Sequence, residues 1–152
     1  LKGDNFNGNK YTSEAFEKGA AFAIVDEAKY VINDKTILVQ DVLLSLQKLA
    51  THHRNHSQAK VIALTGSNGK TTTKEILKDI LSADFKVHAN KKNFNNHWGV
   101  PFTILDTPKD AEIAILEMGM SASGEIQRLC ETQYSCHSHF VLLELLYCFL
   151  VN

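Results

Sequence analysis

A run of small, polar and charged residues follows an apolar segment and has the composition of a phosphate-binding loop. The apolar segment covers residues 61–64, and the run consists of Thr65, Gly66, Ser67, Asn68, Gly69, Lys70, Thr71 and Thr72. Its two glycines allow the backbone to turn sharply and to direct N–H groups at phosphate oxygens. A helix that starts directly after such a turn adds a favourable dipole for an anion. We therefore predict that residues 65–72 bind the phosphates of ATP.

Two side chains near the end of this run, those of Lys70 and Thr71, have separate predicted roles. The common phosphate-loop pattern is G-x-x-x-x-G-K-[ST], and Gly69, Lys70 and Thr71 fit it, whereas Leu64 occupies the position of the first glycine. In such a loop the lysine reaches the β- and γ-phosphates, and the hydroxyl group binds Mg²⁺. The alternative is an ordinary glycine turn between a strand and a helix. The apolar segment before the run and the helical pattern after it favour the phosphate loop.

An acidic residue at the end of another apolar segment is the candidate metal ligand. Glu117 follows residues 113–116, which are all apolar. Ligands of open α/β sheets bind beyond the carboxyl ends of the strands, and a carboxylate there can hold Mg²⁺ against nucleotide phosphates. The alternative is a solvated acid followed by a plain turn. We predict that Thr71 and Glu117 are the metal ligands.

A third segment, residues 93–101, is unusually rich in amides. Its polar side chains are those of Asn93, Asn95, Asn96 and His97, and Gly99 and Pro101 follow them. Amides can bind phosphate, water or metal-bound oxygens without adding charge. Asparagine is equally common in surface turns. The composition alone leaves both interpretations open.

The elements that must position these residues alternate between strands and helices. We expect strands at 61–64, 86–89 and 111–116, with helices at 70–81, from residue 99, and from Ser123 to about 131. This alternation predicts a parallel sheet with helices on both faces. Upstream we expect strands at 20–25 and 36–39, a short helix capped by Ser13, and a longer helix capped by Asp41 that ends near residues 52–57. We place a domain boundary near residue 58.

Charge and cysteine content argue against several other classes of protein. The formal net charge of −1 gives no electrostatic case for nucleic-acid binding. The odd number of cysteines, three, forms neither a disulfide framework nor zinc-ligand spacing. The most apolar stretch, residues 140–151, contains Glu144 and is shorter than the roughly 20 residues of a membrane-spanning helix. We expect a cytoplasmic protein without a membrane span.

Together these motifs resemble the Mur ligases, whose ATP loop also lacks the first glycine. The resemblance rests on residues 65–72, 93–101 and 115–120, and on residues 1–8, which are similar to a domain that binds the UDP-sugar end of the substrate. It covers roughly residues 1–131. Within the family, residues 93–101 and 115–120 are most similar to the members that join D-alanyl-D-alanine to UDP-N-acetylmuramoyl-tripeptide during peptidoglycan synthesis.

The resemblance implies a reaction and a set of site residues. ATP would phosphorylate the terminal carboxylate of the UDP-muramoyl-tripeptide, and the amine of D-alanyl-D-alanine would displace phosphate from the acyl phosphate. The implied catalytic residues are Lys70, Asn96 and Glu117, with Asn96 as the amide near the γ-phosphate. The implied cofactors are ATP and Mg²⁺, and the implied metal ligands are again Thr71 and Glu117.

The resemblance also implies a division of the chain. Residues 1–57 would be part of the UDP-sugar-binding α/β domain, and residues 58–131 part of the central ATP-binding domain with its phosphate loop and parallel sheet. Residues 132–152 depart from the family pattern, and we hypothesise that they are not native to the enzyme. We expect this 152-residue chain to be an inactive fragment, because the family has further domains. The alternatives are a nucleotide-binding fragment without ligase activity, another Mur ligase, and a relative of folylpolyglutamate synthetase.

Overall fold

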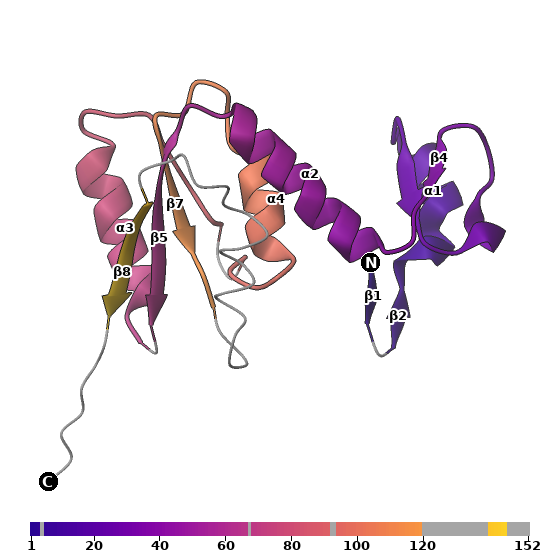
Figure 1. Ribbon diagram of the computed structural model, residues 1–152, viewed down its shortest axis with the longest axis horizontal. Coiled ribbons are helices and arrows are strands. Elements are labelled where there is room, and N and C mark those ends of the chain that lie inside the picture. The colour runs from indigo at the N-terminus through magenta and orange to yellow at the C-terminus, as the bar shows by residue number, and fades with distance from the viewer. Residues whose placement is uncertain (4, 67, 92–93, 120–139, 146–152) are drawn as a thin grey trace, which may run out of the picture. The chain divides into compact units, whose positions relative to one another are not determined.

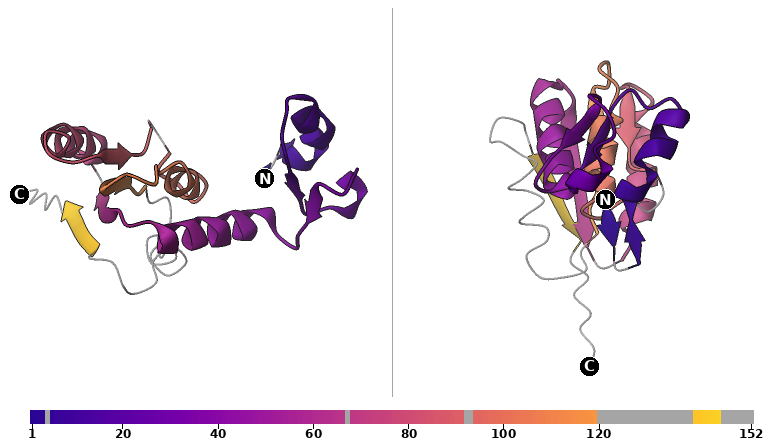
Figure 2. Two further views of the ribbon diagram at one scale, coloured as in Figure 1. Left: turned by 90° about the horizontal axis from the view of Figure 1, so that it is seen from above. Right: turned by 90° about the vertical axis from the view of Figure 1, so that its right-hand side faces the viewer.

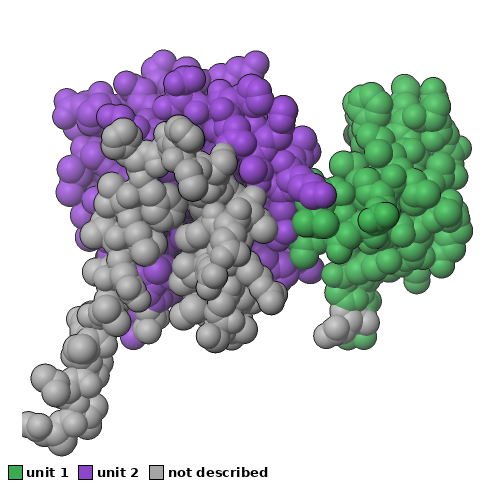
Figure 3. Space-filling model, in the orientation of Figure 1, with its two compact units in different colours: residues 1–46 green, residues 47–152 purple. Residues whose placement is uncertain are grey.

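The structure is a computed structural model that describes residues 1–3, 5–66, 68–91, 94–119 and, for the backbone alone, 140–145. The chain divides into two compact units, Leu1–Leu46 and Gln47–Asn152. Figure 3 shows them in different colours. The division falls within helix α2 (Val42–His56), eleven residues before the domain boundary predicted near residue 58. The second half of α2 belongs to the second unit because Ala50 is buried in that unit's core.

The first unit contains short elements. Strands β1 (Lys2–Gly3) and β2 (Phe6–Asn7) pair antiparallel, and β3 (Ala23–Val25) and β4 (Thr36–Leu38) pair parallel. Between them lie the 3₁₀ helix η1 (Gly8–Tyr11), helix α1 (Thr12–Glu17) and the 3₁₀ helix η2 (Ala28–Tyr30).

The second unit is built around a parallel sheet with the strand order β6-β7-β5-β8 (Figure 1). Its strands are β5 (Lys60–Gly66), β6 (Val87–Ala89), β7 (Ile113–Glu117) and β8 (Phe140–Leu145). Helix α3 (Lys70–Leu81) connects β5 to β6, and α4 (Gly99–Leu105) lies between β6 and β7. In the register of β5 and β7, Leu64 lies opposite Glu117, so the carboxyl ends of both strands lie at the same end of the sheet.

Alternating residues of the two central strands form a separate core on each face of the sheet. One core joins α2 and α4 to Val61, Ala63, Ala114 and Leu116. The other joins Leu77 and Leu81 of α3 to Ile62, Leu64, Ile113 and Ile115. The left view of Figure 2 shows α3 and α4 on opposite sides of the sheet. The predicted parallel sheet covered by helices on both faces is confirmed.

Most predicted elements are present, with shifts of up to three residues at their ends. Helix α3 has the predicted bounds, and Asp41 caps α2 by accepting a hydrogen bond from the Leu44 N–H at 2.8 Å. The predicted cap at Ser13 is wrong, because η1 runs directly into α1 and no side chain caps that helix start. The helix predicted from Ser123 lies outside the described residues. No helix in the described part of the chain has both the length and the apolarity to cross a membrane.

Candidate functional site

The predicted phosphate loop connects the end of β5 to the start of α3. Gly66 and Gly69 adopt positive φ angles of 142° and 78°, the region in which glycine avoids the strain of a side chain. Gly69 immediately precedes the twelve-residue helix α3, whose first N–H groups are available to an anion. Thr65 is buried at the strand end, Asn68 and Thr72 are exposed, and Ser67 lies outside the described residues. The Lys70 ammonium group donates a hydrogen bond to the Gly66 carbonyl and so lies against the loop.

The two predicted metal ligands meet at the end of the sheet where β5 and β7 have their carboxyl ends. The Thr71 hydroxyl lies 3.1 Å from Oε1 and 3.0 Å from Oε2 of Glu117, although 46 residues separate the two in sequence. The Glu117 side chain is only 2% exposed, whereas Thr71 is exposed. The structure therefore brings Thr71 and Glu117 together at the carboxyl ends of β5 and β7, while the ammonium group of Lys70 lies against the adjoining loop.

Three further side chains hold Glu117 in place. Asn95 donates a hydrogen bond to Oε1 at 2.9 Å, and the ammonium group of the buried Lys74 lies 3.7 Å from Oε2. The Asn90 amide binds the backbone of Glu117 on both sides, because its Nδ2 donates to the Glu117 carbonyl and its Oδ1 accepts from the Glu117 N–H. Removing partners from a buried carboxylate is costly, so these contacts fix its position.

Two asparagines of the amide-rich loop, Asn95 and Asn96, have different partners. The backbone carbonyl of Asn95 accepts a hydrogen bond from the Gly119 N–H at 2.6 Å, in addition to the side-chain contact with Glu117. The side-chain oxygen of Asn96 instead accepts hydrogen bonds from the N–H groups of Trp98 and Gly99, at 3.1 and 2.8 Å. Asn96 thus caps the start of α4, and its predicted position near the γ-phosphate stays a prediction. Asn93 lies outside the described residues.

The donor atoms at the site fit a magnesium ion. A hydroxyl oxygen and a carboxylate are hard ligands, and Mg²⁺ is usually bound by one or two carboxylates together with water and substrate phosphates. Among the described residues, no group of three or more His, Cys, Asp and Glu side chains is placed to hold a metal ion. The described side chains alone therefore supply two ligands, Thr71 and Glu117, and leave the others to water and phosphate.

A separate hollow of about 380 Å³ lies between β6 and α4. His88, Phe94 and Phe102 contribute to its lining, and none of the predicted site residues does. Burial lowers the pKa of His88, which favours its neutral form.

The sequence did not identify Lys74 and Asn90 as site residues. Lys74 follows Lys70 by one helical turn, which places both on the same face of α3. That spacing was the available signal, but a lysine on a helix is usually solvated. Asn90 follows β6, and its contact with Glu117 depends on β6 pairing with β7, which a single sequence does not show.

Comparison with known proteins gives a consistent family. The sequence profile of the Mur ligase middle domain matches residues 64–138. The UDP-N-acetylmuramoyl-tripeptide–D-alanyl-D-alanine ligase of Bacillus subtilis (strain 168) is 46% identical over 131 residues, which are 85% of this chain and 29% of that enzyme. The ligase of the same name from Escherichia coli (strain K12) is 35% identical over 83% of this chain and 28% of its own length.

Solved structures agree with these relatives. MurF ligase from Thermotoga maritima, crystallised in complex with ADP, superposes with a TM-score of 0.78 and 37% identity over 87% of this chain and 31% of that one. MurF from Acinetobacter baumannii gives a TM-score of 0.78 and 36% identity over 87% of this chain and 29% of that one. The chain thus spans less than a third of the length of the relatives it matches. The match to the middle-domain profile includes the end of β5, the phosphate loop and Glu117. The similar ligase sequences and the similar solved structures each cover more than four fifths of this chain. The chain belongs to the Mur ligase family.

Proposed function

We propose that this chain provides the nucleotide-binding site of an ATP-dependent ligase that joins D-alanyl-D-alanine to UDP-N-acetylmuramoyl-tripeptide in peptidoglycan synthesis. The observation that carries the proposal is the contact of Thr71 with Glu117 beside a loop whose glycines adopt positive φ angles. Relatives named for this reaction match 85% of the chain, and a solved relative holds ADP. The site would operate in the cytoplasm, where ATP is available.

The first task of the site is to hold the phosphates of ATP. The backbone N–H groups of the loop and the start of α3 would bind the phosphate oxygens. Lys70, which now lies against the Gly66 carbonyl, would turn its ammonium group to the β- and γ-phosphates. Its charge would stabilise the negative charge that builds up on the transferring phosphoryl group.

The second task is to hold a divalent cation beside those phosphates. Mg²⁺, when bound by Thr71 and Glu117, would neutralise phosphate charge and orient the γ-phosphate. Asn95 and Lys74 would keep the Glu117 carboxylate fixed while Thr71 changes partner from the carboxylate to the cation. The site thereby supplies positive charge to the carboxylate-phosphorylating step, which forms the acyl phosphate that the D-alanyl-D-alanine amine attacks.

The proposal is tested by measuring phosphate release in the complete protein that contains this sequence. We expect release of phosphate from ATP to require both UDP-N-acetylmuramoyl-tripeptide and D-alanyl-D-alanine, and to fall at least about a hundredfold in Lys70→Met, in the range expected for loss of an electrostatic stabiliser. Lys78→Met is the matched control, because Lys78 is an exposed lysine of the same helix. Phosphate release that ignores both substrates would contradict the ligase assignment and favour a nucleotide-binding module without ligase activity.

A further inference from the structure

Lys74 is a buried cation next to the proposed metal ligand. Its side chain is 0% exposed, although lysine is among the residues most rarely buried. Its ammonium group donates a hydrogen bond to the Asn90 carbonyl at 2.9 Å and lies 3.1 Å from Oε1 of Glu75. The third neighbour is Oε2 of Glu117, at 3.7 Å.

Lys74 acts on Glu117 through its charge and not through a hydrogen bond. The short contacts of the ammonium group go to Asn90 and Glu75, and they hold it at a distance from Glu117 that is too long for a hydrogen bond. The Glu117 oxygens therefore keep lone pairs that a cation can use. At the same distance the positive charge still acts on the site, because the Lys74 and Glu117 side chains are both buried. Glu75 lies closer to the ammonium group but is 52% exposed, so it offsets only part of that charge.

The charges around the site balance before any ligand is considered. Lys70 and Lys74 contribute two positive charges, and Glu75 and Glu117 contribute two negative ones. The described residues also offer no cluster of three metal-binding side chains. A free divalent cation would therefore find two protein ligands, no excess negative charge and a buried ammonium group nearby.

We propose that Lys74 makes divalent-cation binding at Glu117 depend on bound nucleotide, so that the site takes up the metal together with the nucleotide phosphates and not alone. This inference rests on the proposed function, in which Thr71 and Glu117 hold Mg²⁺ against ATP. The phosphates supply the missing oxygen ligands and the negative charge that outweighs the ammonium group. Lys74 touches neither nucleotide nor metal in this account and acts as a positioning residue that also sets the charge of the site.

The test measures Mn²⁺ binding by electron paramagnetic resonance in the complete protein, with and without ADP. In the wild type we expect ADP to tighten Mn²⁺ binding by at least about tenfold, within the usual range of coupling between sites. In Lys74→Met, which removes the charge and keeps the side-chain length, Mn²⁺ alone should bind about tenfold tighter than in the wild type. Lys78→Met, on the exposed face of α3, should behave as the wild type, and Lys74→Arg should retain the dependence on ADP.

Two outcomes overturn the inference without touching the proposed function. One is wild-type protein that binds ADP but binds Mn²⁺ equally well without it. The other is folded Lys74→Met protein whose affinity for Mn²⁺ alone is unchanged or weaker, which is the result of a purely structural role. If Lys74→Met does not fold, Lys74→Gln takes its place under the same criterion, because it removes the charge and keeps a donor for the Asn90 carbonyl. Wild-type protein that binds no ADP at all would instead refute the proposed function.

Discussion

Neighbouring residues Asn95 and Asn96 are chemically identical but have unlike surroundings in the folded chain. The Asn95 amide donates to the buried carboxylate of Glu117, whereas the Asn96 oxygen accepts from two N–H groups at the start of α4. From the family resemblance, Asn96 was the expected amide near the γ-phosphate. Of these two asparagines, Asn95 is the one that contacts the carboxylate of the proposed metal ligand.

Asn95→Ala and Asn96→Ala should therefore have different effects. Asn95→Ala should weaken Mn²⁺ binding in the presence of ADP by about tenfold, because Glu117 loses a hydrogen bond to a charged group worth about 1.5–3 kcal/mol. Asn96→Ala should lower the free energy of unfolding by about 1 kcal/mol through loss of a helix cap, with little change in Mn²⁺ binding. Electron paramagnetic resonance and urea unfolding measure the two effects. If Asn96→Ala weakened Mn²⁺ binding and Asn95→Ala did not, Asn96 would be the amide at the phosphate site.

The site residues show which features a sequence can reveal. Lys70 and Thr71 belong to a local pattern, and the apolar strand before Glu117 marks the edge where ligands bind, so their meeting was predictable. Lys74 and Asn90 were missed because their roles depend on burial and on the pairing of β6 with β7. Those properties arise only when distant segments pack together.

Among the elements, the contact between α4 and the loop before it controls where Asn95 lies. Gly99 is the first residue of α4 and is buried. A Cβ atom added to it would lie 2.5 Å from both the Cα and the carbonyl carbon of Phe94. Because both are backbone atoms, the loop could not avoid the clash by a side-chain rotation.

We therefore predict that Gly99→Ala displaces the loop that carries Asn95. The variant should lose about 1–3 kcal/mol of stability, the usual cost of overpacking, and should also bind ADP and Mn²⁺ more weakly. Gly3→Ala is the matched control, since its added Cβ would meet nothing within 4 Å. Urea unfolding and ADP titration provide the measurements. Equal stability of the two variants would show that the loop is not held by this contact.

The positions of helices and strands along the chain were easier to predict than which strands lie side by side in the sheet. The helical apolar pattern gave the bounds of α3, and Asp41 marked the start of α2. Strand order was not predictable, because the pattern of β5, β6 and β7 shows only that each strand is buried or half-buried. The start of α1 was misplaced because η1 continues into it, so Ser13 lies inside the helix.

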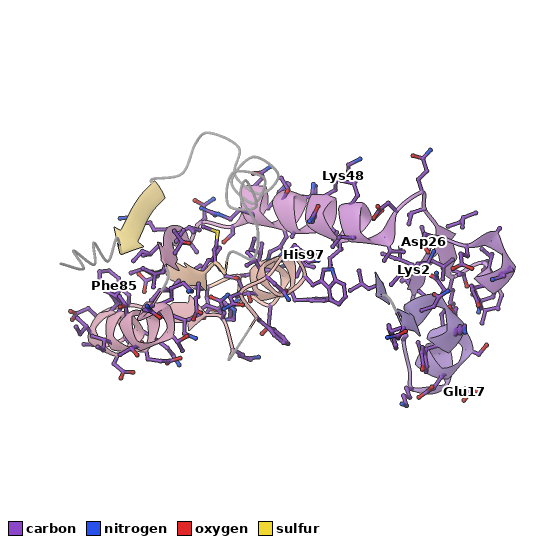
Figure 4. The ribbon with its side chains drawn as sticks, turned by 90° about the horizontal axis from the view of Figure 1, so that it is seen from below. Lys2, Glu17, Asp26, Lys48, Phe85 and His97 are labelled. Carbon is purple, nitrogen blue, oxygen red and sulfur yellow. The ribbon has the colours of Figure 1, made fainter. Side chains whose placement is uncertain are left out.

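At the scale of the whole molecule, the first unit has its own polar cluster, formed by Lys2, Asn7, Asn9, Asp26 and Glu27. Lys2 lies 3.0 Å from a carboxylate oxygen of both Asp26 and Glu27, and Figure 4 shows Lys2 next to Asp26. The contacts with Lys29, Lys2 and Asn7 lower the pKa of Glu27 from 4.5 to about 2. Burial tends to raise the pKa of Asp26, but hydrogen bonds from Asn9 and Lys2 outweigh it and lower that pKa.

We predict that acid destabilises this first unit through the polar cluster. A carboxyl group with a lowered pKa in the folded state stabilises the fold above its unfolded pKa, and this contribution is lost as the pH falls from 4.5 towards about 2. In Glu27→Gln the loss of stability of this unit over the same pH range should be smaller than in the wild type. Peptide-resolved hydrogen exchange of residues 1–46 in urea, at pH 6 and pH 3, measures it. Glu17→Gln is the control, because Glu17 is exposed on the same unit and outside the cluster; an identical acid response in both variants would contradict the prediction.

The central claim is that Thr71 and Glu117 hold a divalent cation against the phosphates of a nucleotide bound by residues 65–72. A crystal structure of the complete protein with ADP and Mn²⁺, recorded at a wavelength where manganese scatters anomalously, tests it most directly. We predict an anomalous peak within roughly 2.0–2.4 Å of the Thr71 hydroxyl and of one Glu117 carboxylate oxygen, with the ADP phosphates on the loop and Lys70 turned towards them. A manganese peak coordinated by other residues, or ADP bound away from the loop, would contradict the account.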